Sequence, residues 1–124
     1  MRICIKTKVL TLVFDTPYLE LNGLLERTLE NVVFLELYRR GYEIYIGKVG
    51  TVEVDFIVIG DDGEEYFQVA YTVIDTSGAT LRRELAPLEA IHDHNQKYLL
   101  TMDNTPLTSP NGIKQINVFD WLLK

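Results

Sequence analysis

The middle of the chain constrains the fold most, because three β-rich segments follow one another there with only short turn signals between them. The segments are Tyr42 to Lys48, Val52 to Ile59 and Glu65 to Val73, and each is rich in β-branched or aromatic residues. Gly50 separates the first two segments, and Asp61-Asp62-Gly63 separates the second from the third. These turn residues predict hairpin connections, so we expect three neighbouring strands.

Helices are expected before and after these strands. From Leu24 to Arg40 the apolar residues recur at helical spacing, and Gly41 follows as a C-terminal stop that tolerates a positive φ. A second helix is expected over Ser77 to Ile91, which carries a helical apolar stripe. Pro87 lies inside this helix and should kink or divide it.

Two further strands are expected after the second helix. They are Lys97 to Met102 and Ile113 to Val118, and a short helical turn follows at Phe119 to Leu123. Strands that return to the sheet after a crossover require at least one parallel pairing. The sequence therefore predicts an α/β fold with a central mixed sheet of about five strands flanked by helices. With 124 residues, of which 47% are hydrophobic, the chain can build one domain core.

The N-terminal region is less regular. Residues 3–14 partly alternate between apolar and polar side chains, which predicts either a strand or an N-terminal extension. We therefore divide the chain into an extension or remnant of an upstream region at 1–23 and a domain at 24–124. No stretch approaches the roughly 20 apolar residues that span a bilayer, and the single Cys4 cannot form an internal disulfide. We expect a cytoplasmic protein with no membrane partner.

Several functional classes find little support in the composition. The net charge of −6 argues against general nucleic-acid binding, which relies on Lys and Arg to neutralise phosphates, although a small basic groove would remain compatible with it. No Gly-rich phosphate loop is present. His92 and His94 form an HxH pair that is more typical of an exposed loop than of a zinc site.

Glu30, Asp55 and Gln68 form the one constellation that could carry chemistry. Asp55 interrupts the apolar run VDFIVI, where a carboxylate is unfavourable unless it is paired, hydrated or bound to a metal. Gln68 interrupts the next apolar strand, and a hairpin at Asp62-Gly63 would bring it near Asp55. Glu30, on the preceding helix, could face the same place.

Several longer pieces of the sequence are distinctive: LENVVFLEL, RRGYE, GKVG, EVDFIV, QVAYTV, LRRELAPL and GIKQINVFDWLL. With these pieces, the stretch from about Leu24 to Leu123 resembles the C-terminal domain of a large prokaryotic family of AAA-type ATPases. That domain carries the restriction-endonuclease-like fold of the PD-(D/E)XK superfamily. Relatives generally carry an ATPase module and a winged-helix segment upstream, so the resemblance implies a fragment, a truncated reading frame or a free-standing paralogue.

The resemblance also implies a divalent-metal site. Active members use a helix Glu, a strand Asp and a Glu-x-Lys triplet to hold Mg²⁺ or Mn²⁺ and to activate a water. The corresponding residues are Glu30 and Asp55, but the triplet here reads Gln68-Val69-Ala70. Gln68 lacks one negative charge and Ala70 lacks the ammonium group. Lys48 is an alternative source of that ammonium.

Three functional hypotheses follow. The first is a catalytically degenerate nuclease-like domain that acts as an accessory module of an ATPase or through its own second copy. The second is an active Mg-dependent DNA phosphodiesterase, with Glu30, Asp55 and Gln68 around the metal and Lys48 as the ammonium. The third is a purely structural dimerisation domain that uses apolar surface from residues 3–14.

Overall fold

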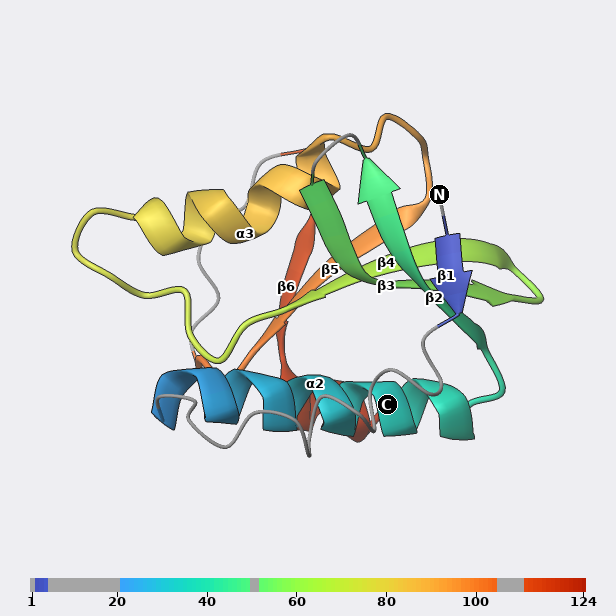
Figure 1. The fold of residues 1–124 in the computed structure, drawn as a ribbon, viewed down its shortest axis with the longest axis horizontal. Coiled ribbons are helices and arrows are strands. Elements are labelled where there is room, and N and C mark those ends of the chain that lie inside the picture. The colour runs from blue at the N-terminus through green and yellow to red at the C-terminus, as the bar shows by residue number, and fades with distance from the viewer. Residues whose placement is uncertain (1, 5–20, 50–51, 105–110) are drawn as a thin grey trace.

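The computed structural model describes residues 2–4, 21–49, 52–104 and 111–124 (Figure 1). Every helix and strand expected from the sequence is present there, with ends that differ by a few residues. The elements are β1 (Arg2–Cys4), α2 (Leu21–Arg39), β2 (Glu43–Val49), β3 (Val52–Gly60), β4 (Gly63–Val69), α3 (Ala79–Glu89), β5 (Gln96–Thr101), β6 (Lys114–Asn117) and α4 (Val118–Leu122).

The strands form one mixed sheet in the order β1-β2-β3-β4-β5-β6. Neighbours from β1 to β4 are antiparallel, whereas β4, β5 and β6 are parallel to one another. The α/β class, the central mixed sheet and the flanking helices are therefore confirmed, as is the expected parallel pairing. Strands β2 to β6 are the five expected ones, and β1 adds a sixth at the edge of the sheet.

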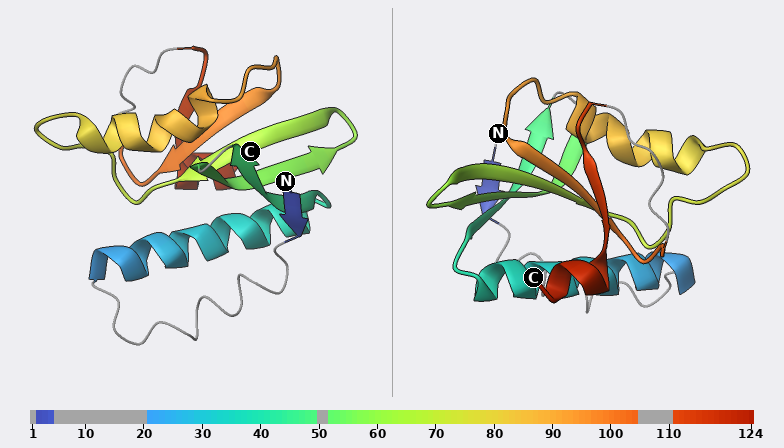
Figure 2. Two further views of the ribbon diagram at one scale, coloured as in Figure 1. Left: turned by 45° about the horizontal axis from the view of Figure 1, so that its top comes forward. Right: turned by 180° about the vertical axis from the view of Figure 1, so that it is seen from behind.

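The sheet separates two apolar cores. Figure 1 shows α2 on one side of the sheet and α3 on the other, and Figure 2 shows α4 on the same side as α2. Burying side chains on both faces explains why the strands are so apolar. The α2 face holds Leu29, Val33, Phe34, Leu37, Ile44, Phe56, Val58, Phe67, Val69, Leu100, Val118 and Trp121. The α3 face holds Val54, Ile57, Tyr66, Ala70, Val73, Leu85, Leu88, Leu99 and Ile113.

Helix α2 follows the periodicity seen in the sequence. Leu29, Val33 and Leu37 are four residues apart, so they lie on one side of the helix, and all three are buried against the sheet. The chain then turns at Gly41, whose φ of 87° confirms the expected left-handed stop. This turn leads the chain directly into β2.

A β-bulge interrupts the pairing of β2 with β3. Tyr45 pairs with Ile57 and Gly47 with Val54, so one residue of β2 lies opposite both Asp55 and Phe56. The extra residue shifts the alternation of side chains along β3. For this reason Val54 joins the core of the α3 face whereas Phe56, two residues later, joins that of the α2 face.

Helix α3 is one continuous helix, so the prediction that Pro87 would divide it is wrong. Pro87 lies in the last turn, two residues before the helix ends at Glu89, and it lacks the N–H that would bond to the Arg83 carbonyl. The helix begins after Gly78, where the Asp75 carboxylate accepts hydrogen bonds from the backbone N–H groups of Gly78 and Thr80. Asp75 thereby satisfies donors that a helix start leaves open.

Helix α4 closes the α2 face of the sheet. Asn117 caps it, because its side chain accepts the backbone N–H of Phe119 and of Asp120. Trp121 is buried in the core, and the Arg40 guanidinium lies over its ring at 4.6 Å. Arg40 also donates to the Trp121 carbonyl at 2.9 Å, which ties the end of α2 to the last helix.

The N-terminal prediction falls largely outside the described residues. Of residues 3–14, the structure describes only Ile3 and Cys4, which pair with Ile46 and Tyr45 of β2. The division of the chain at residue 24 stays a prediction. Across the described ranges, no helix is long and apolar enough to cross a membrane.

Candidate functional site

Asp55 lies where β3 separates from β4. The ladder between these strands ends with Phe56 opposite Phe67, while β4 continues its pairing with β5. Beyond that point the two strands are joined by side chains. The Asp55 carboxylate accepts the backbone N–H of Val69 at 2.8 Å, and the Asp55 backbone N–H donates to Gln68 Oε1 at 3.1 Å. The expected proximity of Asp55 and Gln68 is therefore present in the structure.

Gln68 uses both ends of its amide. Its oxygen accepts from Asp55, and its Nε2 donates to Glu84 Oε2 at 3.1 Å. Gln68 is 6% exposed, and it lies on a strand whose two neighbours at the same face are Tyr66 and Ala70 of the apolar core. A buried amide without these partners would be unfavourable, so the pairing explains how the core accommodates Gln68.

Glu30 completes the cluster from α2. Burial, together with the negative charge of Glu26, raises the pKa of Glu30 to about 7, although Arg27 opposes this change. Burial first, and the charge of Glu30 second, raise the pKa of Asp55 well above its ordinary value. Burial also raises the pKa of Glu84. Glu30 and Asp55 therefore influence one another electrostatically, as the sequence suggested.

Glu84 was missed by the sequence argument. It lies on α3 three residues after Leu81 and four before Leu88, so it occupies the stripe that faces the sheet. Its side chain is 14% exposed, and it forms an ion pair with Arg83 at 3.6 Å. A carboxylate at an apolar-stripe position is the signal that could have identified it.

The positions that would supply a catalytic ammonium do not supply one in the described residues. Ala70 is fully buried in the core on the α3 face. The backbone of Lys48, in β2, pairs with that of Glu53 in β3. The side chain of Lys48 lies outside the described part of the chain. Among the described residues, the candidate centre brings together the carboxylates of Glu30, Asp55 and Glu84 and the amide of Gln68, with the charges of Glu26 and Arg27 acting on Glu30.

The fit of a divalent metal to these residues is poor. Asp55 Oδ2 accepts the Val69 N–H but keeps acceptor capacity, whereas both polar atoms of the Gln68 side chain have protein partners. Among the residues that the structure describes, no group of three or more His, Cys, Asp or Glu side chains is arranged to hold a metal ion. His92 and His94 are both exposed, as expected for a loop. The hydrogen bonds of this cluster suit a closed polar junction better than an open metal site.

The chain is similar to two uncharacterised proteins. One, from Haemophilus influenzae, is 40% identical over 96 residues, which cover 77% of this chain and 23% of that protein. The other, from Methanocaldococcus jannaschii, is 36% identical over 103 residues, which cover 76% of this chain and 21% of that protein. The chain thus spans less than a quarter of the length of the curated relatives it matches.

Other comparisons leave the family open. No family model matches the chain. No solved structure matches it significantly. The resemblance to the nuclease-like domains of AAA-type ATPases therefore stays a prediction.

Proposed function

We propose that the chain is a restriction-endonuclease-like domain with a degenerate catalytic site, which acts in the cytoplasm as an accessory or interaction module of an AAA-type ATPase. The observation that carries this proposal is the hydrogen-bonded junction of Asp55, Gln68 and Glu84. Two of the three residues that correspond to the metal site, Asp55 and Gln68, bond to each other, and Asp55 also bonds to the backbone of Val69 in β4. Ala70 stands where an active member has its lysine.

The lengths of the relatives support a modular role. In both of them the matching region is less than a quarter of a much longer protein. A domain that works beside a larger module would occupy a small share of a long polypeptide in this way. The proposed association with an ATPase can be tested by measuring ATP hydrolysis by the purified full-length protein from Haemophilus influenzae. ATP hydrolysis would support the proposal, and its absence under Mg²⁺ would count against an ATPase partner in the same polypeptide.

The degenerate site is tested by titrating Mn²⁺ into the wild-type protein in a calorimeter. We expect no saturable binding, and no cleavage of supercoiled DNA with Mg²⁺ or Mn²⁺. Gln68→Glu is the matched positive control, because it adds a carboxylate where active members have one and places it beside Glu84. Metal binding that the wild-type protein shows and Asp55→Asn loses would contradict a degenerate site.

One observation favours an active Mg-dependent phosphodiesterase as the second candidate. Glu30, Asp55 and Glu84 all have raised pKa values, and carboxylates with such perturbed pKa values often mark functional sites. A bound cation would stabilise their ionised forms. Metal-dependent cleavage by the wild-type protein that both Asp55→Asn and Lys48→Met abolish would establish this alternative. The dimerisation hypothesis rests on residues 3–14, of which the structure describes only two.

A further inference from the structure

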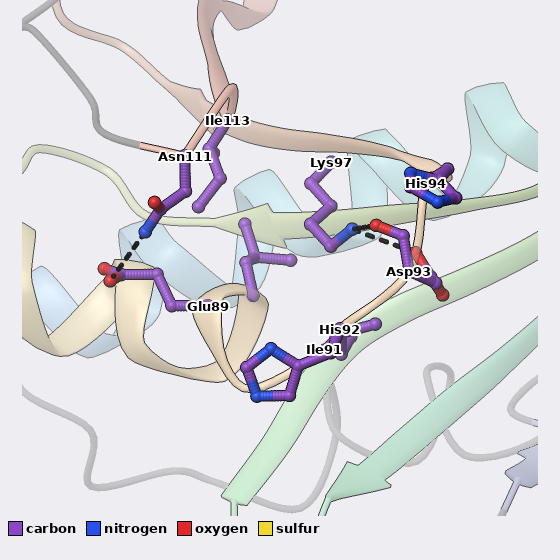
Figure 3. Close-up of a pocket in the computed structure, with 9 residues that line it drawn as sticks. Glu89, Ile91, His92, Asp93, His94, Lys97, Asn111 and Ile113 are labelled. Atoms are coloured by element: carbon purple, nitrogen blue, oxygen red, sulfur yellow. Dashed lines mark hydrogen bonds and ion pairs between the residues drawn. The ribbon is translucent and has the colours of Figure 1, made fainter.

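A pocket of about 510 Å³ opens between the end of α3, the start of β5 and the turn before β6 (Figure 3). It shares no residue with the Asp55 cluster. Its volume lies within the roughly 300–1,000 Å³ that is usual for ligand sites. Leu88 and Ile113, which line it, belong to the apolar core on the α3 face, and Ile91 packs against that core. Leu88 and Ile113 are only 0% and 4% exposed, so the partly exposed Ile91 supplies the accessible apolar surface of the pocket.

The positive charge of this pocket is already neutralised. Lys97 Nζ donates to Asp93 Oδ1 at 2.9 Å, to the Asp93 carbonyl at 3.2 Å and to the Asn95 carbonyl at 3.1 Å. An ammonium group has three donors, so none is left for a ligand. The other Asp93 oxygen accepts the Tyr66 hydroxyl at 2.6 Å. Figure 3 shows this ion pair at one side of the pocket. An anion would find no open cation there.

Glu89 supplies the negative charge that stays available. Its Oε2 accepts a hydrogen bond from Asn111 Nδ2 at 3.3 Å, on the side of the pocket away from Lys97 (Figure 3). No cation pairs with Glu89 among the described residues. The carboxylate keeps acceptor capacity on both oxygens, because each has more than one lone pair. A cationic donor is the group that complements it.

We propose that this pocket binds the side chain of an arginine presented by a peptide segment of a partner protein. A guanidinium group can donate two parallel hydrogen bonds to the Glu89 carboxylate, and its aliphatic stem can pack on the partly exposed Ile91. His92 lies at the rim, where an aromatic ring can stack on a guanidinium plane. The acidic charge of the whole chain, −6, attracts a basic segment.

The openness of the rim favours a peptide over a free small cation. His92, His94 and Asn111 line the pocket and are all exposed to solvent. A site for a small ligand usually buries about 70% or more of the ligand's surface. A pocket with an open rim leaves more of that surface exposed. A peptide can add contacts outside the pocket, whereas a free amine cannot.

The test is a nuclear magnetic resonance titration of ¹⁵N-labelled protein at pH 8 and low salt, with the peptide acetyl-Leu-Arg-Leu-amide. We expect shifted amide signals at residues 88–97 and 111–113, with a Kd on the order of 1 mM or tighter. The same peptide with citrulline, which is neutral and similar in shape, should bind at least tenfold more weakly. Equal binding of the two peptides, or shifts that map elsewhere, would overturn the proposal.

A variant and a free cation complete the test. Glu89→Gln keeps an acceptor for Asn111, so we expect an unchanged unfolding temperature and at least a tenfold loss of peptide affinity. Glu53→Gln, which changes an exposed carboxylate of β3 outside the pocket, should alter the affinity less than twofold. Unchanged affinity in Glu89→Gln contradicts the assignment. Agmatine that binds as tightly as the peptide would show that the ligand is a free small cation and would reject the peptide partner.

Discussion

The Asp55 carboxylate and the Val69 backbone N–H form a hydrogen bond of 2.8 Å across the gap between β3 and β4. Gln68, the residue before Val69, bridges the same two strands, because its side-chain oxygen accepts a hydrogen bond from the Asp55 backbone N–H. Two side-chain bonds therefore replace backbone pairing at the point where the strands diverge. The junction stabilises the strand divergence and places one carboxylate near two others, Glu30 and Glu84.

The stability of the fold should depend on the protonation of this cluster. The pKa of Glu30 is about 7 in the folded protein against 4.5 for an ordinary Glu, so the folded state holds this proton more tightly than the unfolded state. Its stabilising effect is complete below pH 4.5 and is lost as the pH rises through about 7. We expect the free energy of unfolding to fall by on the order of 1 to 3 kcal/mol across that window. Urea unfolding at half-unit pH steps measures it.

Two variants separate this effect from other titrations. Glu30→Gln should reduce the pH dependence between 4.5 and 7 without abolishing it, because Asp55 and Glu84 also have raised pKa values, while Glu53→Gln should leave it unchanged. Hydrogen bonds hold the pKa values of Glu36 and Asp93 at about 2, so their contributions are lost only at more acidic pH. A wild-type stability that is constant or rises from pH 4.5 to 7 would show that the cluster is not protonated as described.

Gln68→Leu should destabilise the protein although leucine suits an apolar strand. The substitution leaves the Asp55 N–H without its acceptor and removes the donor to Glu84. A lost buried hydrogen bond costs about 1 to 3 kcal/mol when one partner remains unsatisfied. Chemical denaturation checks this, with Gln96→Leu as the control at an exposed position of β5. Equal stability of the two variants would mean that water replaces the Gln68 amide.

Arg40→Lys should cost more stability than Arg39→Lys, although both arginines bond to Glu36. Only Arg40 lies over the Trp121 ring and donates to the Trp121 carbonyl, and a lysine cannot reproduce both contacts. We expect a loss of about 1 kcal/mol at Arg40 and a smaller loss at Arg39, which is 70% exposed. Fluorescence of the single tryptophan follows both unfolding transitions. The reverse order would argue that the ring contact contributes nothing.

Gly47→Ala should be destabilising for a reason that lies in β3. A Cβ at position 47 would overlap the side chain of the buried Ile57. Overpacking of this kind costs about 1 to 3 kcal/mol. Ile57→Val removes the outermost carbon of that side chain, so the double variant should lose less stability than the sum of the two single variants. Simple additivity in thermal unfolding would show that the overlap is relieved elsewhere.

Much of the fold was predictable because its signals are local. The spacing of Leu29, Val33 and Leu37 specified α2, and Gly41 and Gly63 marked turns whose φ values of 87° and 110° confirm them. The order of elements predicted at least one parallel pairing, and the structure has two, β4 with β5 and β5 with β6. The sequence pattern did not indicate that α3 would run through Pro87 without a division.

The candidate site was predictable only in part. Asp55 and Gln68 were visible as polar residues in apolar strands, and a hairpin brings them together irrespective of packing. Glu84 comes from a helix 16 residues after Gln68, and only the packing of α3 on the sheet places it there. The pocket beside Glu89 likewise needs α3, β5 and the turn before β6 to meet.

The sequence by itself determined which segments are helices and strands, since periodicity and turn residues act between near neighbours in the chain. Only the tertiary structure decided the bulge opposite Ile46, the protonation of Glu30 and Asp55, and the neutralisation of Lys97 by Asp93. Those properties depend on burial and on charges a few ångströms away, and folding brings such groups together from distant parts of the chain.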